Sequence, residues 1–169
     1  MSGSPRWALE GAPNPAVLRV HVTAELTDRT IVSCPSGIAP PPLDAVLALA
    51  GVRSVDLHRY RARVNLRADA GPQAVREGIQ AAVAAVWGPA SPLPTEETAR
   101  AFPVEYRGAR SVAESLQMAS AGIARALFRA PGVAEVVLAD GEAVVRLGRL
   151  FRWDQVEAAV RAAIGAAGA

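Results

Sequence analysis

The sequence predicts an α+β fold built from two tandem modules, each with the element order β-β-α-β-β-α. The first observation is that residues 43–66 align without a gap with residues 124–147, at an offset of 81 positions. The second is that alternating apolar runs of strand length precede runs with helical spacing. The third is a proline-rich segment between the copies, at residues 88–95. We therefore expect each module to be an antiparallel sheet with two helices on one face.

The duplication is visible as identical residues at equivalent positions. Eight of the 24 aligned positions are identical, against roughly two or three expected by chance in a chain this rich in Ala and Val. The identical pairs are Ala45/Ala126, Gly51/Gly132, Val52/Val133, Val55/Val136, Leu57/Leu138, Ala62/Ala143, Val64/Val145 and Leu66/Leu147. We therefore place the first module at residues 8–88, a linker at 89–95 and the second module at 96–169.

The first half of each module is predicted to contain two strands and a short helix. Residues 17–22 and 29–33 are rich in β-branched side chains, which favours a pair of strands. A helix is expected at residues 40–51, because prolines suit its first turn and a glycine stands at its end. In the second copy either Ser115 or Ser120 could cap the equivalent helix.

The second half of each module is predicted to be a hairpin followed by a longer helix. Residues 52–57 and 61–66 alternate as strands do, and in the second copy the turn contains Asp140-Gly141, a strong hairpin signal. Apolar residues then recur with the spacing of one helix face, over about residues 72–87 and 153–166.

Composition excludes several classes of protein. With 51% hydrophobic and 20% charged residues the chain is expected to be globular and not disordered. The net charge of +2 does not require a nucleic-acid partner. The N-terminus lacks the apolar region of a secretory signal, and no run approaches the ~18 apolar residues of a membrane span. We expect a cytoplasmic protein that does not bind membranes.

Residues that could support catalysis are scarce. His21 and His58 are the only histidines, and neither has a second ligand at metal-binding spacing. The sequence contains no nucleophile elbow, phosphate-binding loop or dinucleotide fingerprint. We therefore expect neither an enzyme nor a bound cofactor.

Cys34 is the single cysteine, so the chain cannot form an internal disulfide. It follows a predicted strand and precedes Pro35-Ser36-Gly37, which predicts partial exposure. Two readings remain open for it. It is either a small apolar residue, or a metal or cluster ligand shared across a dimer, which would still lack two of four thiolates.

A basic strip is the candidate partner surface. On the strand at 61–67 the residues Arg61, Arg63, Asn65 and Arg67 alternate outward. The strip is defined as Arg59, Tyr60, Arg61, Arg63 and Arg67. The equivalents of the alternating positions in the second copy are Glu142, Val144, Arg146 and Gly148, so the strip is not part of the repeat. It could be a solvated face, or it could bind an acidic protein or RNA.

Two segments resemble the N-terminal domain of the Nfu/NifU-type iron–sulfur scaffold proteins. Residues 12–20, APNPAVLRV, are similar to the family's opening Thr-Pro-Asn-Pro-x-x-Leu strand, and residues 123–147 are similar to its Ser-Pro-Leu-Ala-x-x-Leu-Phe-x-Ile-x-Gly-Val segment and hairpin. The first copy has Pro72 where the family has a helix-leading tryptophan, and the second copy lacks Pro-Asn-Pro. The matching residues are Pro13, Asn14, Pro15, Leu18, Gly51, Val52, Leu127, Phe128, Gly132, Val133 and Trp153.

This resemblance implies a role in iron–sulfur cluster assembly. In the family, a separate C-terminal domain with a Cys-x-x-Cys motif binds the cluster, and this chain has no such motif. Without cluster binding, the role that the resemblance implies is that of a non-catalytic accessory module that docks to cluster-assembly or recipient proteins. The alternative is a structural or regulatory interaction protein unrelated to metals, which contacts an acidic partner or RNA through the basic strip.

Overall fold

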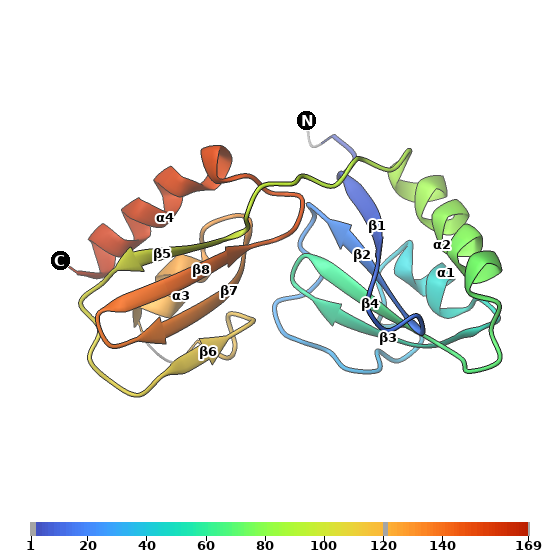
Figure 1. The fold of residues 1–169 in the computed structure, drawn as a ribbon, viewed down its shortest axis with the longest axis horizontal. Helices are drawn as coiled ribbons and strands as arrows, with labels where there is room; N and C mark the ends of the chain where they lie inside the picture. The colour runs from blue at the N-terminus through green and yellow to red at the C-terminus, as the bar shows by residue number, and fades with distance from the viewer. Residues whose placement is uncertain (1–2, 120–121, 169) are drawn as a thin grey trace. The chain divides into compact units, whose positions relative to one another are not determined.

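The computed structural model of the protein describes residues 3–119 and 122–168. The chain divides into two compact units, Met1–Leu93 and Pro94–Ala169, and the boundary falls in the proline-rich segment. Each unit contains a four-stranded antiparallel sheet and two helices (Figure 1). This confirms the predicted α+β fold of two modules.

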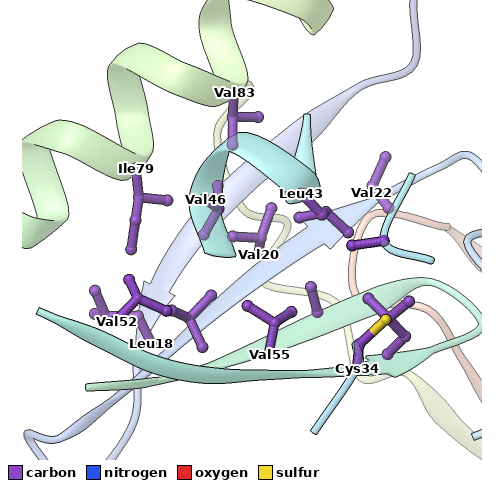
Figure 2. Packing of buried hydrophobic residues seen from close by; sticks show 14 of the residues in the cluster. Leu18, Val20, Val22, Cys34, Leu43, Val46, Val52, Val55, Ile79 and Val83 are labelled. Atoms are coloured by element: carbon purple, nitrogen blue, oxygen red, sulfur yellow. The ribbon is translucent and has the colours of Figure 1, made fainter. Parts of the chain in front are cut away.

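The first unit has the sheet order β1-β2-β4-β3. Its elements are β1 (Trp7–Gly11), β2 (Val17–Val22), α1 (Leu43–Leu47), β3 (Val52–His58), β4 (Arg61–Leu66) and α2 (Pro72–Trp87). Apolar side chains at alternate strand positions meet the buried stripe of each helix, because strands repeat every two residues and helices every 3.6. Figure 2 shows Val46 of α1, Ile79 and Val83 of α2, and Val20 and Val55 of the sheet in one cluster. Both helices therefore lie on one face of the sheet.

The second unit has the same order of elements along the chain but a different strand order in its sheet, β5-β8-β7-β6. Its elements are β5 (Ala99–Pro103), β6 (Ser111–Ala113), α3 (Gly122–Phe128), β7 (Val133–Ala139), β8 (Glu142–Leu147) and α4 (Trp153–Ala167). Leu127 and Phe128 of α3 and Trp153 of α4 are buried in one core cluster with the inner faces of β7 and β8. These matched family residues therefore serve as packing residues here.

The duplication extends to details of the backbone. β3 has a register shift between Val52 and Ser54, and β7 has one at the equivalent residues. The glycine before each strand has a positive φ, +90° at Gly51 and +96° at Gly132. Each glycine carbonyl accepts a hydrogen bond from the residue after the hairpin, over 2.7 Å in the first unit and 2.8 Å in the second. The repeated Gly-Val pair thus builds the same helix-to-strand turn twice.

The predicted pairing of residues 17–22 with residues 29–33 is wrong. β2 lies between β1 and β4, and of residues 29–33 only Ile31 forms a bridge, to Leu57 at the opposite edge of the sheet. The reason is that the β3–β4 hairpin occupies the centre and separates the two segments. Ser33 then has φ of +49°, which turns the chain out of the strand direction.

The sequence did not predict β1. This strand pairs with β2 in antiparallel register, from Trp7 opposite Val22 to Gly11 opposite Leu18. The chain reverses at Asn14, whose carbonyl accepts from the amide of Val17 at 3.1 Å. The indole of Trp7 is buried, and its Nε1 donates to the carbonyl of Gly88 at 2.7 Å. β1 therefore extends the first sheet by a strand that has no equivalent among the described residues of the second module.

The helix predictions differ in accuracy. The helix expected at residues 40–51 is only the five-residue α1, because the prolines up to Pro42 lie before it and the chain turns through Gly51 after it. α2 has the predicted bounds, and α4 ends one residue later than expected.

In the second unit Ser115 does not cap α3. Its hydroxyl accepts from the Met118 amide in a separate turn, and Ser120 lies outside the described residues.

Candidate functional site

The outer face of the first sheet, opposite its helices, carries polar and charged side chains in rows across the strands. One row consists of Glu10 on β1, Arg19 on β2, Arg63 on β4 and Asp56 on β3, each directly opposite the next. The neighbouring row consists of Ala8, His21, Arg61 and His58. Side chains on the same face of adjacent strands lie about 4.5–5.5 Å apart at their Cβ atoms. This face therefore brings together charges that are far apart in the sequence.

The structure divides the predicted basic strip into two parts. Arg61 and Arg63 lie on the outer face of β4, and Arg67 is exposed beyond its end. Tyr60 was expected to belong to the partner surface. Its side chain is only 5% exposed, so it does not contribute to an open surface. Arg59 stacks over the Tyr60 ring at 5.1 Å and pairs with Glu25 at 3.4 Å. Arg59 and Tyr60 thus stabilise the hairpin tip and its neighbouring loop.

Asn65 lies in the outward register of β4 but is 7% exposed, in contrast to the expected open position. Its amide donates to Ser54 Oγ at 3.0 Å and to Asp56 Oδ2 at 3.2 Å. The other carboxylate oxygen of Asp56 accepts from the backbone amide of Ser33 at 2.8 Å. Asp56 therefore joins β3, β4 and the segment that leads to Cys34.

The centre of the candidate site is the pair Arg19 and Arg63. The two arginines are directly opposite each other, an arrangement of like charges that is unfavourable by itself. Arg19 pairs with Glu10 at 3.5 Å, whereas exposed Arg63 has no ion-pair partner in the described chain. A shallow hollow adjoins the pair, lined by Ala12, Pro13, Asn14, Val17, Arg19, Arg61 and Arg63.

Sequence reasoning missed Arg19 and the contribution of the Pro-Asn-Pro turn. The matched family residues Pro13 and Asn14 border the hollow beside the arginines, and Pro15 lies in the same turn. The alternation of residues 17–22 already placed Arg19 and His21 on one face. The missing information was that this strand lies next to β4, which no local pattern specifies.

The histidines are structural parts of this face. His21 is buried, and its Nε2 lies 3.1 Å from Glu10 Oε1, while His58 is half-buried at the end of β3. Within residues 3–119 and 122–168, no group of three or more His, Cys, Asp or Glu side chains could hold a metal ion.

Cys34 is buried, with 4% exposure, which corrects the expectation that it is partly exposed. Figure 2 shows its sulfur within the core cluster of the first unit. Its amide donates to the Val55 carbonyl at 2.8 Å, and burial raises the pKa of its thiol. A neutral thiol inside the core is a poor metal ligand, and a ligand shared across a dimer would need to reach the surface.

The outer face of the second sheet has a different chemistry. The row equivalent to Arg19–Arg63 consists of Ala101, Val144, Val137 and Val112 on β5, β8, β7 and β6. Val112 is 36% exposed, and Val137 and Val144 are half-buried. The two modules thus have cores of the same pattern, but this row of the outer face is charged in the first unit and apolar in the second.

An ion-pair cluster joins β5 to α4 in the second unit. Glu157 accepts from Arg100 at 2.6 Å and pairs with Arg161 at 2.7 Å. Arg100 also stacks over the Trp153 ring at 4.7 Å, and Arg161 over the Phe102 ring at 5.3 Å. The pKa of Glu157 is lowered, and the main cause is the hydrogen bond from Arg161.

Replacing Glu157 by glutamine is expected to lower the stability of the second unit at neutral pH and to have a smaller effect in acid. The carboxylate is favoured in the folded state, so its contribution is present above its ordinary pKa of 4.5 and is lost as pH falls through the lower folded value. Urea denaturation from pH 7 to pH 3 measures the difference between the two proteins. A difference that grows toward low pH would contradict this assignment.

Comparisons with protein-family models, curated proteins and solved structures find no match to this chain. In the described part of the chain, no helix is long and apolar enough to cross a membrane.

Proposed function

We propose that the chain is a cytoplasmic, non-catalytic protein-binding module associated with iron–sulfur cluster assembly. The observation that supports the binding role is the difference between the outer faces of the strands that are equivalent in the two sheets, β2 and β4 in the first and β5 and β8 in the second. The core residues are retained in both copies, whereas Arg19 and Arg63 of the first outer face are replaced by Ala101 and Val144 in the second. Charged side chains that oppose each other on an open face contribute no core packing, which favours a role in recognition.

The class of partner rests on the resemblance of residues 12–20 and 123–147 to the Nfu/NifU N-terminal domain. The partners it suggests are cluster-assembly proteins or the proteins that receive clusters. The buried, neutral Cys34 supports docking over cluster carriage, since the thiolate is the form that binds metal.

Affinity purification of the tagged full chain after anaerobic lysis tests this function. We expect cluster-assembly or recipient proteins to be captured, and we expect Arg19→Glu/Arg63→Glu to reduce their recovery. The matched control is Arg29→Glu/Arg110→Glu, which makes the same charge change at two exposed arginines outside the face. Recovery of no iron–sulfur proteins by the wild-type chain would refute the association.

The Arg19–Arg63 pair also favours a second candidate, a regulatory or structural interaction protein unrelated to metals. This candidate predicts capture of acidic proteins that depends on the two arginines but includes no iron–sulfur protein. Quantitative mass spectrometry of the same wild-type, double-variant and control samples distinguishes the two.

A further inference from the structure

We propose that the outer face of the second sheet is the interface of a homodimer, in which it packs against the same face of a second copy of the chain. The two-fold axis would run along the apolar row that consists of Ala101, Val144, Val137 and Val112. The inference goes beyond the proposed function, because it concerns the other sheet and a different kind of partner. It specifies the surface, its occupant and the orientation of the two copies.

The apolar row crosses all four strands of the sheet. Its residues lie directly opposite one another on β5, β8, β7 and β6. Ala101 is exposed, Val112 is 36% exposed, and the other two are half-buried. The core of the second unit is built from the alternate residues of these strands, which lie on the inner face. A contiguous apolar row on an outer face indicates an interaction surface, whereas single exposed apolar residues do not.

The first unit shows that the fold does not require apolar side chains in this row. Arg63 and Asp56 occupy the positions of Val144 and Val137 in an equivalent hairpin that has the same register shift. The two valines therefore do not serve to form the hairpin. Their partly exposed surface is unfavourable in water, and burial against a second apolar surface would be favourable.

The charges beside the row identify a second copy as the occupant. On β8, Glu142 lies on one side of Val144 and Arg146 lies on the other, and all three belong to the outer face. A two-fold axis along the row reverses the direction of β8 in the second copy. Glu142 of each copy would then face Arg146 of the other. A surface that is complementary to itself in this way is what a two-fold symmetric interface requires.

Arg146 can make this contact although it already has a partner in its own chain. Its Nε donates to Glu135 Oε1 at 3.3 Å, and its side chain is 49% exposed. A guanidinium has several further N–H donors, so its terminal amino groups can donate to a second carboxylate. Glu142 and Arg146 are about 13 Å apart along the strand. Strand side chains stand roughly perpendicular to the sheet, so this separation favours pairing between copies over pairing within one copy.

The size of the face predicts a weak dimer. β6 has three residues, and the other strands have five to seven, so the interface lies at the small end of the range for specific complexes. Exposed ion pairs contribute little affinity and mainly set the orientation of the partners. We therefore expect a monomer–dimer equilibrium with a dissociation constant in the micromolar range.

Sedimentation velocity of the full chain over a wide range of concentrations tests the proposal. We expect the wild type to shift from monomer to dimer as its concentration rises. Val144→Arg introduces the residue that the first unit has at the equivalent position, so the variant should fold. It should weaken the dimer about tenfold or more, because two like charges would meet on the axis. A wild type that stays monomeric, or Val144→Arg that dimerises equally well, would refute the proposal.

Val86→Arg is the matched control for this substitution. Val86 is 51% exposed on α2 of the first unit, and the variant is expected to dimerise like the wild type. Thermal melting by circular dichroism at low concentration measures whether each variant remains folded. Equal weakening of the dimer by Val86→Arg would show that added charge alone is responsible, and would also refute the proposed interface.

Charge exchange tests the orientation of the two copies. Glu142→Arg and Arg146→Glu would each place like charges against one another, and each should weaken the dimer about tenfold or more. A mixture of the two variants should associate, because both arginines of one copy would then face both glutamates of the other. The variant with both substitutions should dimerise like the wild type. If the mixture and the double variant associate no better than the single variants, the proposed two-fold axis is wrong.

Discussion

Substitution of Gly132 by alanine is expected to destabilise the second unit by about 2–5 kcal/mol. Gly132 has φ of +96°, a conformation that costs other residues roughly 1–2 kcal/mol. An added Cβ would also lie 2.8 Å from Phe151 Cδ1 and 3.0 Å from Val156 Cγ2. Such overpacking typically costs a further 1–3 kcal/mol or so. Urea denaturation followed by two-dimensional amide NMR measures each unit separately.

Gly141→Ala provides the matched control within the same unit. Gly141 also has a positive φ, +78°, but an added Cβ there would meet no atom within 4 Å. Only the backbone cost of roughly 1–2 kcal/mol is therefore expected. Equal losses for the two variants would show that the contacts with Phe151 and Val156 are not important.

The repeat, the hairpins and the longer helices could be predicted because their signals are local. Asp140-Gly141 indicates a tight turn in the sequence, and the 3.6-residue spacing of Val75, Ile79 and Val83 defines the α2 core stripe. The order of strands in the sheet could not be predicted in this way. Residues 17–22 have the same strand pattern whether they pair with residues 29–33 or with β4, and tertiary packing decides between the two.

The candidate site shows the same division between local and non-local information. Period-two alternation correctly placed Arg61 and Arg63 on one face. It could not indicate that Arg19 lies opposite Arg63, because that pairing requires the sheet register. The basic strip also included Tyr60 as a partner-surface residue, whereas this side chain is buried and Arg59 stacks over its ring. Contacts between distant segments thus determine which members of the basic strip are accessible.

Replacing Asp56 by alanine is expected to destabilise the first unit by about 2 kcal/mol or more and to expose Cys34. The carboxylate is buried and accepts from both the Ser33 amide and Asn65. Removal of a buried acceptor leaves donors unsatisfied, at about 1–3 kcal/mol each. Ser33 has a positive φ and directly precedes Cys34. The segment that buries the thiol would lose its side-chain attachment to β3 and would keep only the backbone hydrogen bonds of Ile31 with Leu57 and of Cys34 with Val55.

The thiol itself reports this change, because Cys34 is the only cysteine in the chain. Reaction with Ellman's reagent under native conditions should be slow in the wild type, where Cys34 is buried and its pKa is raised, and faster in Asp56→Ala. Asp28→Ala is the control, since this exposed acid lies in the same connecting segment. A wild-type rate in Asp56→Ala would mean that core packing and the backbone hydrogen bonds to β3 are sufficient to hold Cys34 in place. An increased rate would identify Asp56, which the second module replaces with Val137, as the residue by which the first module keeps its thiol inside the core.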